Sequence, residues 1–376
     1  MGFLEKIKSV LPVSSRSFHA YERELSQKLD SLEVMMRVLG DRLAAFEEGE
    51  REISKRVEQS YWDITGNIDY KFEKLTLPTL QKIEGTLDAH DAFVSAHLWD
   101  QYRNEDETEE EARLRFFKSI PPAKGALRAH QTASAQLLRE FDALCRDNGL
   151  RYWIEFGTLL GAVRHGGFVP WDDDLDVGMV RPDLERLRKV AQRDDRYRIT
   201  EVFDAAVHCR QIRFRYADEG KPFFIDLFVY DFVPSNSKTL LKAYGEIRLA
   251  MVEAMRGDSR LDAWHAATFA QVEESPDINA AFEEGNHALR SLGFGCNEEE
   301  ARGLAWGIEN MDGGAAYPWS LFPINDVFPL RRLHFEGVEC FVPNNPEGML
   351  TRVYGDYLLF PKDIRTHYKH VSLEDE

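Results

Sequence analysis

Cysteine is scarce in this chain and widely spaced. Among 376 residues there are four cysteines, Cys145, Cys209, Cys296 and Cys340, and no two of them form a C-x-x-C pair. Neither a structural zinc site nor a disulfide framework is therefore expected. Because reduced thiols are typical of cytoplasmic proteins, we expect the chain to be cytoplasmic.

Long apolar runs are also missing. No stretch approaches the roughly 18 apolar residues that a transmembrane helix needs, and no secretory signal opens the sequence. Residues 1–13, MGFLEKIKSVLPV, are mildly amphipathic. Such a segment can contact a membrane surface, which would place the chain at the inner face of the membrane. A frayed first helix is the simpler interpretation.

An excess of basic residues is absent as well. The formal net charge is −18 at pH 7, whereas proteins that bind nucleic acids usually carry a basic surface. We therefore expect no nucleic-acid partner. A nucleotide can still bind to an acidic protein through a metal ion.

The first hundred residues carry a regular apolar pattern. Apolar residues follow alternating steps of four and three, with polar interruptions at Glu50 and Ser60. A repeat of this kind over about five heptads predicts a coiled coil, and hence a homo-oligomer. An antiparallel hairpin packed on the rest of the chain is the alternative. The pattern comprises Leu25, Leu29, Leu32, Met36, Leu39, Leu43, Phe46, Ile53, Val57 and Ile64.

Beyond this stripe the pattern changes phase. Ile68, Phe72 and Leu75 continue it one residue late, which loosens or reorients a supercoil. Pro78 is then expected to break or kink the helix. A second helical stretch is expected over about 79–103.

These patterns divide the chain into three parts. Residues 1–103 are the expected coiled-coil region for oligomerisation or docking, and 104–124, with the acidic run NEDETEEE, are the expected linker. Residues 125–370 predict an α/β (α+β) domain with a helical insertion at about 236–312. The expected strands are 150–156, 169–180, 197–203, 211–216, 223–230, 331–335 and 338–342, and the expected helices are 127–147, 158–163 and 182–193.

Four carboxylates crowd into the motif GTLLGAVRHGGFVPWDDDLD, residues 157–176. Asp172, Asp173, Asp174 and Asp176 cannot all be buried as bare anions, so a cation must lie among them or some must face water. On a strand, Asp174 and Asp176 would point to one side, since residues i and i+2 share a face. Paired carboxylates of this kind predict a site for Mg²⁺ or Mn²⁺.

A further carboxylate lies inside a later apolar strand. Asp226 is flanked by phenylalanine and isoleucine in FIDLF, residues 224–228. Burying a single acid there is costly unless it is paired or bound to a metal. Asp226 is therefore the predicted third ligand, or else it forms an ion pair with Arg213 or Arg215. Asp231 is a weaker candidate, because a strand end tolerates aspartate.

The motif resembles the nucleotidyltransferase superfamily and, more closely, the LicD family, which includes fukutin and fukutin-related protein. The Gly-Thr turn, Arg164-His165, Pro170-Trp171 and the aspartate cluster stand in the family's order. The tail VFPLRRLHFEGVECFVPNNPEGMLTRVYGDYLLFP is also similar. The resemblance implies a nucleotidyltransferase-like mixed sheet flanked by helices, preceded here by the long helical region.

The resemblance also implies an activity. This is transfer of a phospho-alcohol group, such as phosphocholine, ribitol phosphate or glycerol phosphate, from a CDP-linked donor to a hydroxyl of a cell-surface glycan. Its chemistry agrees with the motif, because Mg²⁺ can neutralise a diphosphate and backbone N–H groups at a helix start can hold a phosphate. The resemblance implies that the catalytic residues are Asp174, Asp176 and Asp226. The implied metal ligands are these three residues and Asp172. The implied donor-binding residues are Gly157, Thr158, Arg164 and His165.

Two features of the sequence depart from the family pattern, and four further residues have expected roles. Phe156 stands where many relatives carry glycine, and no cysteine-rich zinc loop of the fukutin-related type is present. Trp171 is expected to pack under the loop or to stack on a cytosine base. Tyr354, Asp356 and Lys362 are expected on the acceptor side, by analogy alone.

Two other functions remain open from the sequence. A true nucleotidyltransferase would move NMP from an NTP to a small molecule on the same sheet. A non-catalytic scaffold of a surface-polymer assembly complex would use only the coiled coil. The intact aspartates speak against the scaffold.

Overall fold

A computed structural model describes residues 15–205, 207–266, 270–271, 275–310 and 320–360. The chain divides into two compact units, Met1–Leu98 and Trp99–Glu376. The amphipathic residues 1–13 and Lys362 lie outside the described residues, so their expected roles stay predictions. None of the described helices combines the length and the apolar composition that a membrane span requires.

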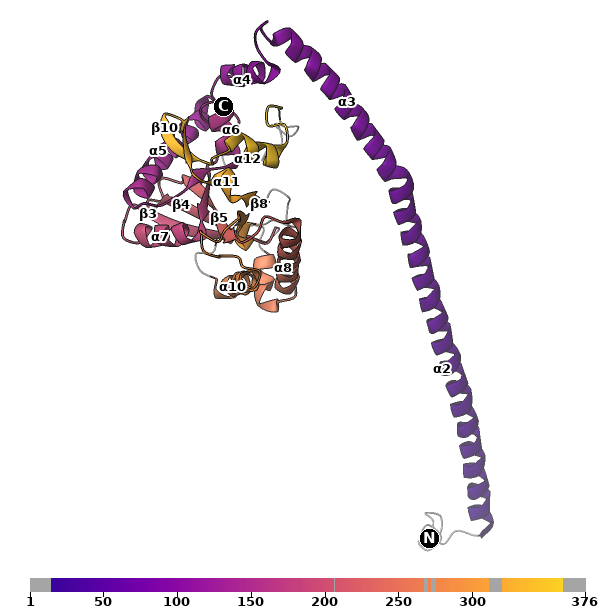
Figure 1. Cartoon of the computed structure of the whole chain (residues 1–376). Coiled ribbons are helices and arrows are strands. Elements are labelled where there is room, and N and C mark those ends of the chain that lie inside the picture. The colour runs from indigo at the N-terminus through magenta and orange to yellow at the C-terminus, as the bar shows by residue number, and fades with distance from the viewer. Residues whose placement is uncertain (1–14, 206, 267–269, 272–274, 311–319, 361–376) are drawn as a thin grey trace. The chain divides into compact units, whose positions relative to one another are not determined.

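The N-terminal unit is a single helical rod (Figure 1). Helix α2 (Ser15–Lys71) continues through the π-turn η1 (Phe72–Thr76) into α3 (Leu77–Tyr102). Pro78 therefore does not end the helix. A proline lacks the N–H that would bond to the preceding turn, and the wider π-turn immediately before it accommodates this loss. The rod is continuous through Pro78, and no hairpin forms at this point.

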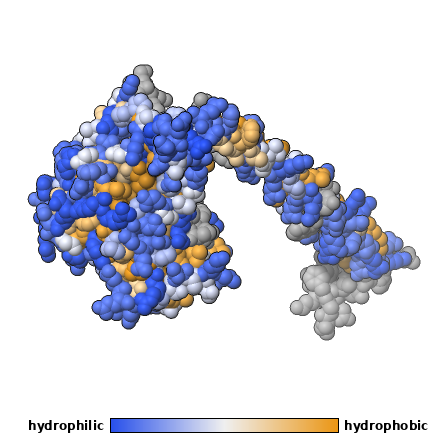
Figure 2. All heavy atoms as spheres, turned by 45° about the horizontal axis from the view of Figure 1, so that its top comes forward, coloured by the Kyte–Doolittle hydropathy of each residue, from blue (hydrophilic) through white to orange (hydrophobic). Residues whose placement is uncertain are grey.

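The apolar stripe of the rod is exposed along its described part. Leu32, Leu39 and Phe46 are 55%, 64% and 69% exposed, and Figure 2 shows hydrophobic patches among the charged residues of the rod. Helices of a coiled coil bury residues at this spacing against a partner. The stripe is thus available to a second helix.

The first half of the C-terminal unit supplies most of its sheet. Its helices are α4 (Glu109–Ser119), α5 (Gly125–Asp147), α6 (Phe156–Arg164) and α7 (Arg181–Ala191). Its strands are β1 (Trp153–Ile154), β2 (Asp176–Val180), β3 (Tyr197–Asp204), β4 (Cys209–Tyr216) and β5 (Phe224–Val233). Each predicted strand and helix of this region is present, with shifted ends.

The second half adds a helical layer, three further strands of the main sheet and a separate two-stranded sheet made by its last two strands. Its helices are α8 (Lys238–Arg256), η2 (Ser259–Leu261), α9 (Asp262–His265), α10 (Pro276–Arg290), η3 (Ile308–Asn310), α11 (Ile324–Val327) and α12 (Pro346–Tyr354). Its strands are β6 (Ala270–Gln271), β7 (Gly303–Trp306), β8 (Leu321–Pro323), β9 (Arg331–Phe335) and β10 (Val338–Val342). The last two strands match their predicted bounds, with Glu336 and Gly337 in the turn at φ 49° and 71°.

The sheet is mixed, which confirms the predicted α/β class. Its main path runs β1-β2-β5-β4-β3-β6, and β7 and β8 extend it beside β5. β2 and β5 are parallel, and their register places Asp176 opposite Asp226. The expected helical insertion contains β7, which pairs with β5 and so belongs to the main sheet.

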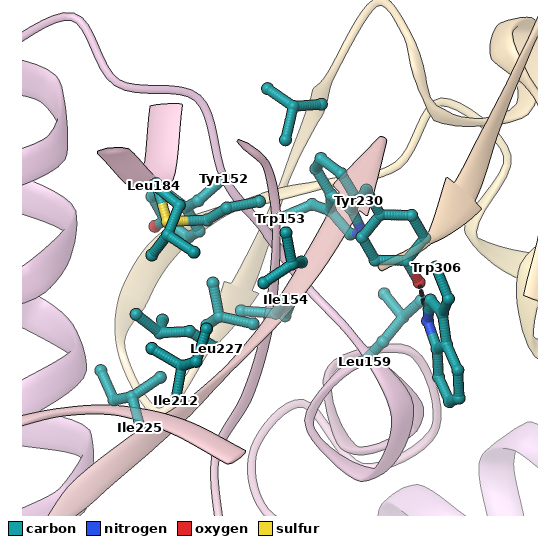
Figure 3. Packing of buried hydrophobic residues seen from close by; sticks show 14 of the residues in the cluster. Tyr152, Trp153, Ile154, Leu159, Leu184, Ile212, Ile225, Leu227, Tyr230 and Trp306 are labelled. Atoms are coloured by element: carbon teal, nitrogen blue, oxygen red, sulfur yellow. Dashed lines mark hydrogen bonds between the residues drawn. The ribbon is translucent and has the colours of Figure 1, made fainter. Parts of the chain in front are cut away.

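The core fills both faces of the central strands. β2 is buried along its whole length, and β5 alternates buried and half-buried residues up to Val229. Figure 3 shows Ile212, Ile225 and Leu227 from β4 and β5 grouped near Ile154. Because parallel strands are covered on both faces, this part of the chain reads as nearly continuous apolar sequence.

Helix α4 lies within the segment expected to be an acidic linker. Thr108 and Glu111 form a capping box at its start, which satisfies exposed N–H groups there. Its Phe117 is fully buried, so the segment contributes to the core of the C-terminal unit. The acidic run is therefore the start of a packed helix.

Substitution of two stripe residues tests association through the rod. We expect Leu32→Glu with Leu39→Glu to raise the dissociation constant of a homo-oligomer on the order of 100-fold or more, because buried charge replaces buried leucine. Light scattering over a concentration series measures the mass. The control is Ser31→Glu with Val38→Glu, which adds the same charge one residue earlier, off the stripe. An unchanged mass in the stripe variant would argue against association through this face.

Candidate active site

One cavity gathers most of the residues that the sequence singles out. Its volume is ≈ 650 Å³, and it lies where the start of α6, the loop before β2 and the segment around the end of α12 meet. Asp172, Asp174 and Asp176 lie on its wall. The other lining residues are Phe156, Gly157, Leu160, Arg164, Val169, Trp171, Val353, Tyr354, Asp356, Tyr357, Leu359 and Phe360.

The loop that carries the carboxylates is fixed to helix α5 by contacts to its main chain. Gln131 Nε2 donates to the carbonyl oxygen of Asp172 over 2.8 Å, and His130 Nε2 lies 2.9 Å from the carbonyl oxygen of Asp173. Gln131 is fully buried, so this contact replaces water. No sequence pattern indicates this contact, because a hydrogen bond to a main-chain carbonyl does not depend on which residues the loop contains.

Gly157 and Thr158 serve the site in different ways. A Cβ atom at position 157 would lie 2.5 Å from Asp172 Oδ2, so only glycine allows this close approach. Thr158 is buried, and its Oγ1 accepts a hydrogen bond of 2.8 Å from the backbone N–H of Asp176. Gly157 therefore faces the cavity, whereas Thr158 lies behind its wall and ties α6 to β2.

The strand geometry expected for Asp174 is wrong. β2 begins at Asp176, so Asp174 precedes the strand and the two-residue alternation does not apply to it. Both residues still line the cavity, because the loop leads directly into the strand. Asp173 was expected to pair with a basic residue or to face solvent; it is only 3% exposed and does not line the cavity, so it does not face solvent.

Burial and mutual repulsion disfavour negative charge on Asp172 and Asp176. Burial raises the pKa of Asp172 to about 6, although a hydrogen bond with Asp174 opposes this. Burial also raises the pKa of Asp176 well above its ordinary value, and the charges of Asp174 and Asp226 add to the effect. A cation among these groups would reverse both shifts.

Asp226 lies beside Asp176, but its carboxylate is engaged by an arginine. The two aspartates are register partners in the parallel pair β2 and β5. Arg213, the register partner of Asp226 on β4, donates from Nε to Asp226 Oδ1 over 2.9 Å. Asp226 does not line the cavity. The ion pair with Arg213 was one of the two arrangements that the sequence left open, and it holds this carboxylate next to the cavity. Asp231 is buried further along β5 and bonded to Arg181.

The donor chemistry of the cavity fits a hard divalent cation. Mg²⁺ and Mn²⁺ prefer carboxylate oxygens, and Asp172, Asp174 and Asp176 supply them on one wall. In the described ranges, no three His, Cys, Asp or Glu side chains are arranged as a preformed metal site. The carboxylates would therefore reorient around an ion, a change that relief of their repulsion favours.

Arg164 is the cation of the cavity wall. Its guanidinium carbon lies 4.2 Å from the ring centre of Phe117. Its Nη1 donates to the carbonyl oxygens of Tyr357 (2.8 Å) and Leu359 (3.1 Å), and its Nε donates to His165 Nε2 (3.1 Å). Burial lowers the pKa of Arg164 to about 10, so the side chain remains charged at neutral pH. It can therefore balance negative charge in the cavity.

His165 is neutral and positions Arg164. Since Nε2 accepts from Arg164, the ring proton is on Nδ1, which donates to the carbonyl oxygen of Phe117 over 3.0 Å. Burial, together with the charge of Arg164, lowers the pKa of His165 to about 4. It does not line the cavity. Arg164 and His165 were both expected to contact the donor. Of the two, only Arg164 is charged at neutral pH and lines the cavity.

Phe156 has a backbone conformation that suits glycine. Its φ is +42°, in the left-handed region that costs an L-residue about 1–2 kcal/mol. Glycine adopts this conformation without that cost. The strain gives a physical reason for glycine at this position in similar sequences.

A buried hydrogen-bond chain supports α6 from behind. Trp306 Nε1 donates to the hydroxyl of Tyr230 over 2.7 Å (Figure 3), and this hydroxyl donates to Glu155. Burial raises the pKa of Glu155 to about 8, so it adds little negative charge beside Asp176 at neutral pH. Glu155, Tyr230 and Trp306 are far apart in the sequence and form no motif, so no sequence pattern indicates this hydrogen-bond chain.

The other side of the cavity carries the residues expected near the acceptor. Tyr354 and Asp356 both line it. Arg113 of α4 donates from Nη1 to Asp356 Oδ2 over 2.7 Å, which joins α4 to this side. Trp171 lines the same cavity, with its ring centre 5.9 Å from that of Phe360.

Residues 149–246 match the model of the family described as LicD/FKTN/FKRP, nucleotidyltransferase domain. This range contains α6, β2 and β5, and with them the carboxylates of the cavity and Asp226. The fold and the site therefore define a domain of the nucleotidyltransferase type. More narrowly, residues 149–246 are similar to the LicD/FKTN/FKRP family.

Named relatives resemble different extents of the chain. Lipopolysaccharide cholinephosphotransferase LicD of Haemophilus influenzae is 27% identical over 271 residues, which cover 65% of this chain and 97% of the relative. Ribitol 5-phosphate transferase FKRP of Homo sapiens is 35% identical over 91 residues, which cover 23% of this chain and 18% of the relative. An uncharacterised protein of Rickettsia prowazekii is 29% identical over 150 residues, covering 39% and 52%.

The neutral state of His165 predicts a loss of stability in acid. Because its folded pKa lies below its ordinary value, its contribution is present above pH 6.5 and is lost as the pH falls toward 4. The loss is about 3 kcal/mol at most. His165→Gln keeps one donor and one acceptor but cannot be protonated, so its melting temperature should fall less between pH 7 and 4.5. His334→Gln, at an exposed histidine, should behave like the wild type. Equal acid sensitivity of His165→Gln and wild type would contradict this.

Proposed function

We propose that the protein transfers a phospho-alcohol group from a CDP-linked donor to a hydroxyl of a cell-surface glycan, with Mg²⁺ or Mn²⁺. The match of residues 149–246 to the LicD/FKTN/FKRP family model supports such a transfer in general. So do the names of two relatives, a cholinephosphotransferase and a ribitol 5-phosphate transferase. The observation that carries the proposal is the cavity with Asp172, Asp174 and Asp176 on one wall and the cationic Arg164 beside them.

The donor diphosphate would lie between these groups. A bound divalent cation would neutralise its charge and polarise its oxygens. Asp174 and Asp176 would hold this ion, with Asp172 as a further ligand, and Arg164 would balance charge on the leaving CMP. Gly157, which has no side chain, leaves its main chain open to a phosphate.

The acceptor hydroxyl must lose a proton as it attacks the phosphorus. Asp226 is the proposed proton acceptor or a further ligand, because it lies in register with Asp176 at the edge of the cavity. Its partner Arg213 fixes the orientation of the carboxylate. Either role requires Asp226 to turn from Arg213 toward the cavity when the substrates bind.

The setting of the reaction is part of the proposal. A glycan acceptor and a CDP-linked donor are the partners, and we place the protein in the cytoplasm, at the inner face of the membrane if residues 1–13 contact lipid. The rod would bring the domains together as a homo-oligomer, because its stripe has the spacing of a coiled-coil seam.

Release of CMP tests the reaction. With Mg²⁺ present, we expect CMP from at least one of CDP-choline, CDP-ribitol and CDP-glycerol, and no pyrophosphate from NTPs. Asp174→Asn and Asp176→Asn should each lower kcat/KM on the order of 100-fold or more, because the diphosphate charge is no longer balanced.

The matched control is Asp173→Asn, which changes a neighbouring aspartate that does not line the cavity. It should retain activity within about tenfold of the wild type. Pyrophosphate release from an NTP would favour the nucleotidyltransferase alternative. Unchanged activity in Asp174→Asn would favour a scaffold.

Metal binding has a readout that is independent of turnover. Mg²⁺ should raise the melting temperature of the wild type, because an ion that binds only the folded cavity stabilises it. Asp176→Asn should melt higher than the wild type without metal, because it removes a buried charge from a repulsive group, and should gain little from Mg²⁺. EDTA should abolish transfer, and Mg²⁺ should restore it. An equal response of both proteins to Mg²⁺ would place the ion elsewhere.

A further inference from the structure

Phe156 is strained in a backbone conformation that glycine adopts without strain. It is one of three non-glycine residues with positive φ among the described residues, together with His208 and Glu336. Glu336 lies in the hairpin turn of β9 and β10, where positive φ is required. Phe156 instead begins α6 directly before Gly157. Strain of this kind persists where the surroundings enforce it, and it is common in binding sites.

The ring of Phe156 is held by two other aromatic rings. Its centre lies 4.8 Å from that of Phe228 and 5.3 Å from that of Trp306, in edge-to-face arrangements. Phe228 and Trp306 stack on each other at 5.8 Å. Trp306 is fixed in turn by its hydrogen bond to Tyr230 (Figure 3). The Phe156 ring therefore has a rigid support.

Of these three aromatic residues, only Phe156 lines the cavity. Asp172, Asp174 and Asp176 line the same cavity. The apolar surface that Phe156 adds to the cavity would bind a flat, apolar group attached to the diphosphate. A quaternary ammonium group is usually bound by several converging ring faces, and other aromatic residues of the cavity are available to one: Trp171, Tyr354, Tyr357 and Phe360.

We propose that Phe156 is a donor-binding residue whose ring stacks on the nucleobase of the donor, in the cavity of the carboxylates that hold the diphosphate. This inference rests on the proposed function and names the wall that receives the base. Base–aromatic stacking tolerates any base and is strong enough to hold a nucleotide in place. Trp171, on the same cavity, is the competing candidate, but its ring packs on Phe360 and His165.

The test separates the ring from the backbone strain. Calorimetry with Mg²⁺ present measures the affinities for CMP, phosphocholine and inorganic pyrophosphate. Phe156→Ala removes the ring and keeps the strain, whereas Phe156→Gly removes both. We expect each to lower CMP affinity about tenfold or more, with pyrophosphate affinity within about twofold of the wild type. Phe156→Tyr should restore CMP affinity. Phe156→Gly should melt higher than Phe156→Ala, because only glycine relieves the strain.

Three results would overturn the inference. In the first, Phe156→Gly, which lacks the ring but is free of strain, binds CMP like the wild type. The ring would then have a structural role only. In the second, Trp171→Leu loses CMP affinity and Phe156→Ala does not. In the third, Phe156→Ala loses affinity for phosphocholine and keeps it for CMP. If the wild type binds pyrophosphate but not CMP, the proposed function itself is contradicted, and the inference about Phe156 is contradicted with it.

Discussion

Crowded negative charge at the start of β2 is the constraint on which the site depends. Asp172, Asp174 and Asp176 share one cavity, and Asp226 stands beside Asp176 on the neighbouring strand. Burial makes their charge costly, yet the fold keeps them together. It does so with neutral groups, since a side-chain amide and a threonine hydroxyl hold the main chain of the loop and strand. These contacts to the main chain fix positions without neutralising the carboxylates.

Positive side chains lie at different places around these aspartates and have different roles. Arg213 compensates Asp226 outside the cavity, and Arg164 lies on the wall with its orientation fixed by two carbonyl oxygens. His165 is uncharged and holds the guanidinium from the side. Deep in the domain, Glu309 is paired with Arg181 and Arg210, and these pairs lower its pKa. Ion pairs thus balance charge in the scaffold, whereas Asp172, Asp174 and Asp176 share the cavity wall with Arg164, where a charged ligand would change the balance.

The sequence was sufficient where a local pattern decides the structure. The hairpin of β9 and β10 was predicted to the residue because alternating apolar residues flank Glu336-Gly337. The motif predicted that Asp226 would lie next to Asp176, which the parallel register confirms. It could not locate the start of β2, because aspartates before a buried strand fit a loop and a strand equally well. Nor could it predict β7 or the contact between Gln131 and the loop, which depend on chain segments that meet only in the folded domain.

The π-turn in the long rod has a consequence for partner choice. In the sequence, the apolar pattern falls one residue behind before Pro78, and a π-turn accommodates one additional residue in a helical turn. An inserted residue would otherwise rotate the downstream side chains by about 100° away from the seam. The wide turn therefore offsets a delay of one residue for the side chains that follow it. In the proposed homo-oligomer, two copies in parallel, unstaggered alignment would have their wide turns at the same level.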